Sequence, residues 1–366
     1  MPEPRLPLIT ADLRLLDANA RYIMDACRRQ GVQLAAVTKV ACANSHVAQT
    51  LLDAGADMLA DARDRNLARL PLAVPRLSLR VSDPALAMDT VRHSEYSLQS
   101  GITAIRALGA AARALNRPHK IILMIDLGDL REGIHYSDRE RVHEAARAAL
   151  AEEGLELAGV GSNLTCFGGI LPDARNLGIL LDIASDLRSA FGIPLPLVSG
   201  GNSSSLHLLF DGKLPRGINH LRVGEGLLLG MDTAYGRPFP QLSQQAFTLT
   251  ARLVEVEDKP SLPEGSTGPN AFGEEVRFED LGPMRRGILA VGRQDTDSGG
   301  LTPTDPAVTI LGASSDHLLV DLTRAPGYRV GDTLSFCPAY GALLKAYTSA
   351  YVGKAAITKE GKTLYE

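Results

Sequence analysis

The sequence has no tryptophan, only four cysteines in 366 residues, and no long apolar run. No window approaches the roughly 18 consecutive apolar residues that a membrane-spanning helix needs, so we expect no membrane protein. Four widely spaced cysteines fit neither a disulfide framework nor a CxxC metal site, and we expect no metal. Lysine and arginine (38) do not outnumber aspartate and glutamate (42), which argues against a nucleic-acid-binding surface.

The chain has an ordinary globular composition, with 45% hydrophobic and 22% charged residues. Its length is ample for a large core and for two domains. The first residues, Met-Pro-Glu-Pro-Arg-Leu-Pro, lack the apolar stretch of a signal peptide. Together with the few cysteines, this predicts a cytoplasmic protein.

From residue 34 to about 225, short apolar runs alternate with longer segments of helical spacing, such as 138–152 and 172–191. This alternation is typical of βα units that build a parallel sheet. Eight units favour a (β/α)8 barrel of the TIM type over a doubly wound sheet, whose first turn would carry Gly-x-Gly-x-x-Gly. The runs are 34–40, 58–60, 77–81, 96–98, 121–127, 157–161, 195–198 and 221–223.

After about residue 240 the runs become shorter, and turns rich in proline and glycine separate them, which predicts a smaller all-β domain. We expect the barrel at 1–235 and the β domain at 236–366, with a linker at 236–240. The N-terminal strand is a candidate member of the β domain. The expected strands are 247–256, 288–291, 308–311, 317–322, 331–336 and 355–359.

In a (β/α)8 barrel, active-site residues follow the carboxyl ends of the strands. Lys39 ends the first run. It is either a strand-end charge in solvent or a partly desolvated amine that forms Schiff bases with carbonyl compounds. Arg131 follows the fifth run and could present its fork of donors to a carboxylate, the alternative being a turn with paired surface charges.

Two further loops are suited to a phosphate group. Segment 199–205, Ser-Gly-Gly-Asn-Ser-Ser-Ser, offers hydroxyls and free backbone N–H groups, although such turns also cap helices. Segment 222–226, Arg-Val-Gly-Glu-Gly, lets backbone N–H groups approach a phosphate, and barrels often hold phosphates after their last two strands. Together with Lys39, the two loops form a stronger signal than any one part.

These residues together resemble the alanine racemase-type enzymes, which are fold type III enzymes dependent on pyridoxal phosphate (PLP), and most closely the ornithine racemase-like amino-acid racemases. The resemblance covers nearly the whole chain. It implies PLP as cofactor, a free amino acid of basic, ornithine-like character as substrate, and a homodimer with an active site shared between subunits. The strings that carry it are 126–133, 163–166, 199–205, 292–297 and 312–320.

The resemblance also implies residue roles. Lys39 would bond PLP and act as one base, Arg131 would contact the substrate carboxylate, and Arg222 would face the pyridine nitrogen. The loop 312–321 would enter the site of the partner subunit. The implied cofactor-binding residues are Lys39, Asn163, Asn202, Ser203, Ser204, Arg222, Gly224, Glu225 and Tyr351.

The chain departs from alanine racemases at two places. Their Gly-Tyr-x-Asp segment, which holds a catalytic tyrosine, reads Gly-Arg-Gln-Asp at 292–295, and Ala43 stands where they carry a tyrosine after the lysine. Alanine is therefore not the expected substrate. Asp295 and His317 are the leading candidates for the second base, with Tyr340 and Tyr347 also open. The candidate partners for a distal ammonium group are Asp129, Asp295, Asp297 and Asp316.

Arg222 bears on the type of reaction. A guanidinium stays protonated and does not readily give a proton to the pyridine nitrogen, which favours racemisation over the fold type III decarboxylases that use a glutamate there. Glu225, three residues away, keeps decarboxylation as an alternative. A non-catalytic PLP-binding protein and a sugar- or phosphate-metabolising barrel are further alternatives, and the β region argues against the first.

Overall fold

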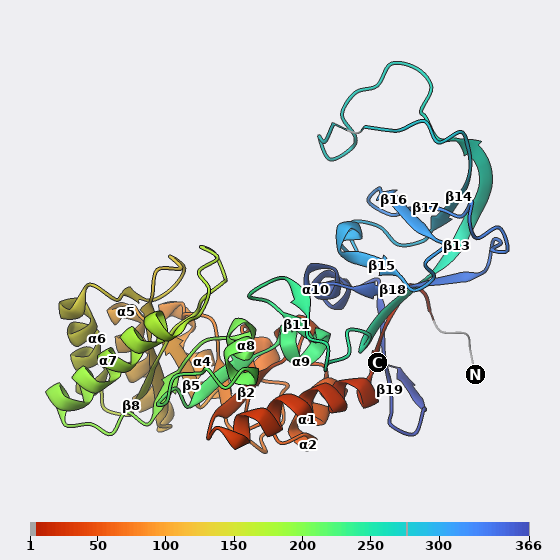
Figure 1. Ribbon diagram of the computed structural model, residues 1–366. Helices are drawn as coiled ribbons and strands as arrows, with labels where there is room; N and C mark the ends of the chain where they lie inside the picture. Colours follow the sequence, from red (N-terminus) through yellow and green to blue (C-terminus); the bar gives the residue numbers. More distant parts are fainter. Residues whose placement is uncertain (1–4, 276, 366) are drawn as a thin grey trace. The chain divides into compact units, whose positions relative to one another are not determined.

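The computed structural model describes residues 5–275 and 277–365 (Figure 1). The chain divides into two compact units. The first unit is Leu15–Gln244, and the second combines the residues through Arg14 with those from Gln245 onward. The segment 236–240, expected to be the linker, lies inside the first unit. The first strand, β1 (Leu8–Asp12), belongs to the sheet of the second unit.

The first unit is a closed barrel of eight parallel strands. β10 pairs with β2 in the register Arg222 with Ala35 and Val223 with Ala36, which closes the ring. The eight predicted runs coincide with these strands, so the (β/α)8 prediction is confirmed. The barrel strands, in order, are β2 (Gln33–Val37), β3 (Met58–Asp61), β4 (Arg76–Ser78), β5 (Tyr96–Gln99), β6 (His119–Asp126), β8 (Leu155–Gly161), β9 (Leu197–Ser199) and β10 (His220–Val223).

Helices connect the strands, and their ends follow local signals. Asp138 accepts the N–H of Arg141 at the start of α6, and Asp173 forms a capping box with Asn176 at the start of α7. Short strands β7 (Ile134–His135), β11 (Met231–Asp232) and β12 (Arg237–Pro238) lie in the connections. The helices are α1 (Leu13–Arg29), α2 (Ser45–Asp53), α3 (Asp64–Leu67), α4 (Ala87–His93), α5 (Ile102–Leu115), α6 (Arg139–Ala151), α7 (Ala174–Phe191), α8 (Leu206–Phe210) and α9 (Glu225–Leu229).

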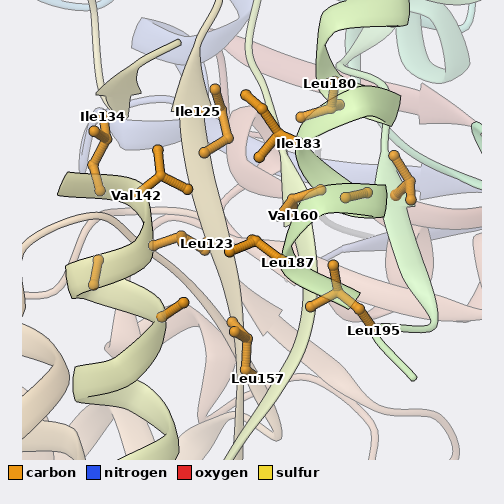
Figure 2. Close-up of a cluster of buried hydrophobic side chains, with 14 of the residues drawn as sticks. Leu123, Ile125, Ile134, Val142, Leu157, Val160, Leu180, Ile183, Leu187 and Leu195 are labelled. Carbon is orange, nitrogen blue, oxygen red and sulfur yellow. The ribbon is translucent and has the colours of Figure 1, made fainter. Parts of the chain in front are cut away.

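One part of the barrel core lies between β6 and β8 and the helices α6 and α7 (Figure 2). Leu123 and Val160 on the strands and Leu187 on α7 are among its buried members. Gly159 on β8 is required by close packing, because a Cβ atom there would lie 2.3 Å from the carbonyl oxygen of Leu197 on β9. Strands buried on both faces read as continuous apolar runs, which explains why the sequence revealed them.

The second unit is mostly strand, as expected, and the sequence did not indicate its helix α10 (Tyr340–Thr348). Its main path runs β16-β17-β14-β13-β1-β19-β20, and β18 pairs with both β13 and β15. β1 lies in the interior of this sheet, antiparallel to β13 and parallel to β19. The remaining strands are β13 (Phe247–Pro260), β14 (Pro283–Leu289), β15 (Leu301–Pro303), β16 (Thr309–Ala313), β17 (Leu318–Asp321), β18 (Thr333–Pro338), β19 (Gly353–Ile357) and β20 (Thr363–Tyr365).

Two histidines are buried in the barrel wall. His119 shares a hydrogen bond with Ser97 (2.8 Å), and burial lowers its pKa to about 4. His220 shares one with Ser199 (2.6 Å), and burial lowers its pKa to about 3. Both pKa values are depressed in the folded state, so the unfolded chain binds protons more readily below about pH 6.5. Folding stability contributed by the neutral histidines is therefore lost as pH falls from about 6.5.

We expect His119→Gln to lose less stability on acidification than the wild type. Between about pH 6.5 and 4, the free energy of unfolding should fall less steeply with pH in the variant than in the wild type. The two slopes should differ by up to about 1.4 kcal/mol per pH unit. Urea unfolding of the PLP-free protein at a series of pH values measures this slope. The exposed His135→Gln should keep the wild-type slope; identical slopes in all three proteins would contradict the assignment.

Candidate active site

Lys39 stands two residues beyond the end of β2, half-buried, and begins the one-turn 3-10 helix Lys39–Ala41. The preceding residue, Thr38, donates its hydroxyl to the buried carboxylate of Asp61 at the end of β3 (3.0 Å). Burial raises the pKa of Asp61, while hydrogen bonds from Asn66 and Thr38 oppose the rise. The turn that carries Lys39 is therefore anchored to the neighbouring barrel strand.

The loops after β9 and β10 meet beside this turn. The hydroxyl of Ser203 accepts the backbone N–H groups of Gly224 (3.3 Å) and Gly226 (3.1 Å), which joins the two loops. A Cβ atom on Gly224 would lie 3.2 Å from the Cβ of Val37, the last residue of β2. The structure thus brings both phosphate-compatible loops to the same barrel mouth as Lys39.

Asn202 and Glu225 complete this part of the mouth. The Asn202 side chain accepts the N–H of Ser204 (2.8 Å) and donates to the carbonyl of Leu164 (3.0 Å) in the loop after β8. Burial raises the pKa of Glu225, and the positive charge of Lys39 opposes the rise. Glu225 and Lys39 therefore interact electrostatically.

Arg222 is 2% exposed and lies at the end of β10. Its guanidinium donates to the carbonyl of Ser162 (2.7 Å), to the Oδ1 atom of Asn163 (2.6 Å) and to the hydroxyl of Ser199. Burial lowers the pKa of Arg222 to about 10, so the group still carries its charge at neutral pH. Three hydrogen-bond acceptors therefore fix the Arg222 guanidinium in place near the carboxyl end of the strand.

Arg131 lies in the loop after β6, beside a residue that the sequence did not single out. The Oε1 atom of Glu132 accepts a hydrogen bond from Nη2 of Arg131 (2.5 Å), and its Oε2 atom accepts one from Nε of the same guanidinium. Asn163 donates its Nδ2 atom to the same Oε1. Although burial alone would raise it, the Arg131 guanidinium holds the pKa of Glu132 below its usual range. The only sequence signal was an acidic residue next to the candidate arginine.

Asp129, a candidate partner for a distal ammonium group, is engaged elsewhere. Its carboxylate accepts the backbone N–H groups of Cys166 (3.1 Å), Phe167 (2.9 Å) and Ile170 (3.2 Å), and the residue is 1% exposed. These three bonds hold the loop after β8. Asp129 therefore stabilises this loop.

The remaining candidates belong to the second unit. Asp295 is buried, and its carboxylate accepts the hydroxyl of Ser349 (2.8 Å). Tyr347 is also buried and packs edge-on against Phe247. His317 is exposed in the turn between β16 and β17, next to the exposed Asp316. Three others are distributed over the same unit: the half-buried Tyr340, the exposed Tyr351 and the helix-capping Asp297.

The residues of the barrel mouth fit PLP. The groups required are an amine for the aldehyde, a donor for a phosphate and a fixed contact for the ring nitrogen. Lys39, the hydroxyl of Ser203 and Arg222 are of these types. Gly201, with a φ of 116°, has the left-handed backbone that favours glycine, and a Cβ atom there would meet the hydroxyl of Ser205 at 2.7 Å. The backbone conformation that only glycine adopts easily therefore sets the shape of this loop, as in phosphate sites built from backbone N–H groups.

Over the described ranges, we find no group of three His, Cys, Asp or Glu side chains arranged to hold a metal ion. Nor is any helix among the described residues long and apolar enough to cross a membrane. None of the four cysteines, all of which are described, forms a disulfide bond.

An eight-stranded barrel with a lysine after its first strand, followed by a mostly-strand unit, defines the alanine racemase type of fold. Residues 11–231 match the family "Alanine racemase, N-terminal domain". The chain is 44% identical to the ornithine racemase of Acetoanaerobium sticklandii, covering 95% of this chain and 99% of that protein. It is 38% identical to the lysine racemase of Thermotoga maritima, covering 95% and 98%. The chain therefore belongs to the alanine racemase family.

Solved structures agree on the fold. Alanine racemase from Streptomyces coelicolor A3(2) matches with a TM-score of 0.74 and 20% identity, covering 96% of this chain and 97% of that one. D-threo-3-hydroxyaspartate dehydratase from Delftia sp. HT23 matches with a TM-score of 0.72 and 16% identity, covering 99% and 97%. At this level of identity the likeness establishes the architecture of the whole chain.

We expect Asp129→Asn to loosen the loop after β8. An amide has one acceptor oxygen, so at least one of the three backbone N–H groups loses its partner, at a cost of about 1–3 kcal/mol. Amide hydrogen exchange, measured by mass spectrometry on peptides covering 165–171, should become faster. The exposed Asp182→Asn on α7 is the control. Unchanged exchange with weaker binding of basic amino acids alone would restore Asp129 as a substrate contact.

Proposed function

We propose that this chain is a PLP-dependent racemase of a basic amino acid, with Lys39 holding the cofactor and acting as one of two bases. The observation that carries the proposal is the position of Lys39 at the same barrel mouth as the joined loops of Ser203 and Gly224. Relatives named ornithine racemase and lysine racemase, each matched over 95% of this chain, support a substrate with a basic side chain.

Different residues of the barrel mouth would bind different parts of the cofactor and of the substrate. When bound, PLP supplies an electron sink that makes the Cα–H bond acidic. Asn202, Ser203, Ser204 and the backbone of Gly224 and Glu225 would hold its phosphate, with Tyr351 as a further contact. Asn163 would lie beside the ring, and Arg222 would hold the ring nitrogen without giving it a proton. Arg131 would bind the substrate carboxylate through charge-assisted hydrogen bonds.

Proton transfer then requires a base on each face of Cα. The Lys39 amine would take and return the proton on one face. Among the four candidates for the opposite face, Asp295 and Tyr347 are buried, whereas His317 is exposed in the turn between β16 and β17. Histidine gains and loses a proton near neutral pH, which suits transfer in both directions.

We further propose a C2 homodimer in which a second copy of the chain supplies His317 to each barrel mouth. The cytoplasm is the proposed location, because four cysteines without a disulfide bond fit a reducing compartment.

Single enantiomers of ornithine, lysine, arginine, serine and alanine test the function. With PLP in deuterated water, we expect loss of optical rotation together with Cα deuteration, fastest for ornithine or lysine. Lys39→Ala should abolish both, and it should remove an absorbance band near about 410–430 nm that reports a lysine-bound cofactor. Lys213→Ala, at an exposed lysine, should behave as the wild type. Carbon dioxide release without racemisation would establish decarboxylation instead.

Mixing two inactive variants tests the shared site. In a hybrid of Lys39→Ala with His317→Ala, one site carries both substitutions and the other carries neither. Random reassortment after mild denaturation should restore about a quarter of wild-type activity, because half of the dimers are hybrids with one intact site. No recovery, in variants that separately keep the wild-type size on gel filtration, would mean that Lys39 and His317 do not serve one site across two copies.

A further inference from the structure

Glu132 connects two arginines that the proposed function uses separately. Its Oε2 atom accepts from Nε of Arg131, and its Oε1 atom accepts from Nη2 of Arg131 (2.5 Å) and from Nδ2 of Asn163. The Oδ1 atom of Asn163 accepts in turn from Arg222 (2.6 Å). A continuous series of hydrogen bonds therefore runs from the loop after β6 to the end of β10.

We propose that Glu132 is a positioning residue that fixes the Arg131 guanidinium for the substrate carboxylate and, through Asn163, ties it to Arg222. This inference rests on the proposed function for the identity of the ligand that Arg131 binds. It assigns Glu132 no contact with the substrate or the cofactor.

The geometry of the guanidinium supports this role. A carboxylate that occupies Nε and one hydrogen of Nη2 takes the side of the group and leaves the end, formed by Nη1 and the other hydrogen of Nη2. That end is a second fork of parallel donors that can bind another carboxylate in a bidentate manner. Arg131 is partly exposed (42% of its side chain), so without Glu132 its long side chain would be free to take other directions.

The amide of Asn163 can satisfy both neighbours in only one orientation. Its oxygen faces a guanidinium, which only donates, and its NH₂ group faces a carboxylate, which only accepts. The reverse orientation would set donor against donor at Arg222 and acceptor against acceptor at Glu132. The negative charge of Glu132 thus fixes the side-chain orientation that holds Arg222.

Charge balance leads to the same assignment. Lys39, Arg131 and Arg222 place three cationic groups around one barrel mouth, and Arg222 is almost fully buried. Burial opposes the lowered pKa of Glu132, yet the contacts with Arg131 and Asn163 and the charge of Arg222 keep the carboxylate ionised. Ionised Glu132 offsets one of these charges where two guanidinium groups come close.

Glu132→Gln is a nearly isosteric test. An amide replaces one acceptor oxygen by an NH₂ group, which must then face a donor of Arg131 or Asn163. For a basic amino acid, we expect KM to rise about ten- to a hundredfold while kcat changes less than about threefold, because substrate and transition state lose the same carboxylate contact. Glu144→Gln, at an exposed position on α6, is the matched control and should leave both constants unchanged.

A second measurement needs no activity. In PLP-free protein, phenylglyoxal modifies arginines, and pairing with a carboxylate protects them by holding the guanidinium protonated. Mass spectrometry should show Arg131 modified several-fold faster in Glu132→Gln than in the wild type or Glu144→Gln. Thermal unfolding of the same proteins identifies a purely structural effect. Such an effect would lower the unfolding temperature of Glu132→Gln without raising KM selectively over kcat.

The outcomes separate the two proposals. If the wild type racemises no amino acid, the proposed function fails, while the modification rate still decides whether Glu132 holds Arg131. Equal modification rates in the wild type and Glu132→Gln would overturn the inference. An unchanged KM, or a loss of kcat alone, would overturn it as well.

Discussion

The pairing of β10 with β2 is the interaction on which the candidate site depends. It joins residues about 190 positions apart, Arg222 with Ala35 and Val223 with Ala36, and closes the barrel. Because both strands are parallel and in this register, the loops that follow them lie side by side. Gly224 then packs on Val37, and Glu225 comes within the electrostatic influence of Lys39. The first and last βα units can therefore share one ligand only because the sheet closes on itself.

Closing the barrel buries the charged side chain of Arg222, and the surrounding polar groups offset the free-energy cost of that burial. Arg222, near the end of β10, is shielded from water, and this burial lowers the pKa of its guanidinium. Three acceptors, from Ser162, Asn163 and Ser199, replace the lost water. Ser199 is itself hydrogen-bonded to the buried, neutral His220. A guanidinium kept charged in this way neither accepts a proton nor readily gives one up.

Much of this arrangement could be predicted from the sequence. Strands buried on both faces give continuous apolar runs, so all eight barrel strands were recognised, and α6 and α7 were recognised from their helical spacing. β15 and β20 have three residues each, as β4 and β9 do, but they are only partly buried and so give no apolar run. α10 contains a glycine and two tyrosines, which weaken the helical signal. Glu132 was missed because its role arises from contacts with Asn163 on another strand end, which no local pattern reveals. The backbone contacts of Asp129 with the loop after β8 escaped prediction for the same reason.

The place of β1 in the second unit affects how the chain can fold as it is made. β1 ends at Asp12, but its neighbours β13 and β19 begin at Phe247 and Gly353. At about 5–20 residues per second, a ribosome takes roughly 10 to 50 s to reach the first of these partners. Throughout this interval the barrel sequence can emerge and close while the earliest strand waits without a sheet. β1 is thus a strand exposed to wrong pairing, and its final place is filled only after β13 and β19 have both been made.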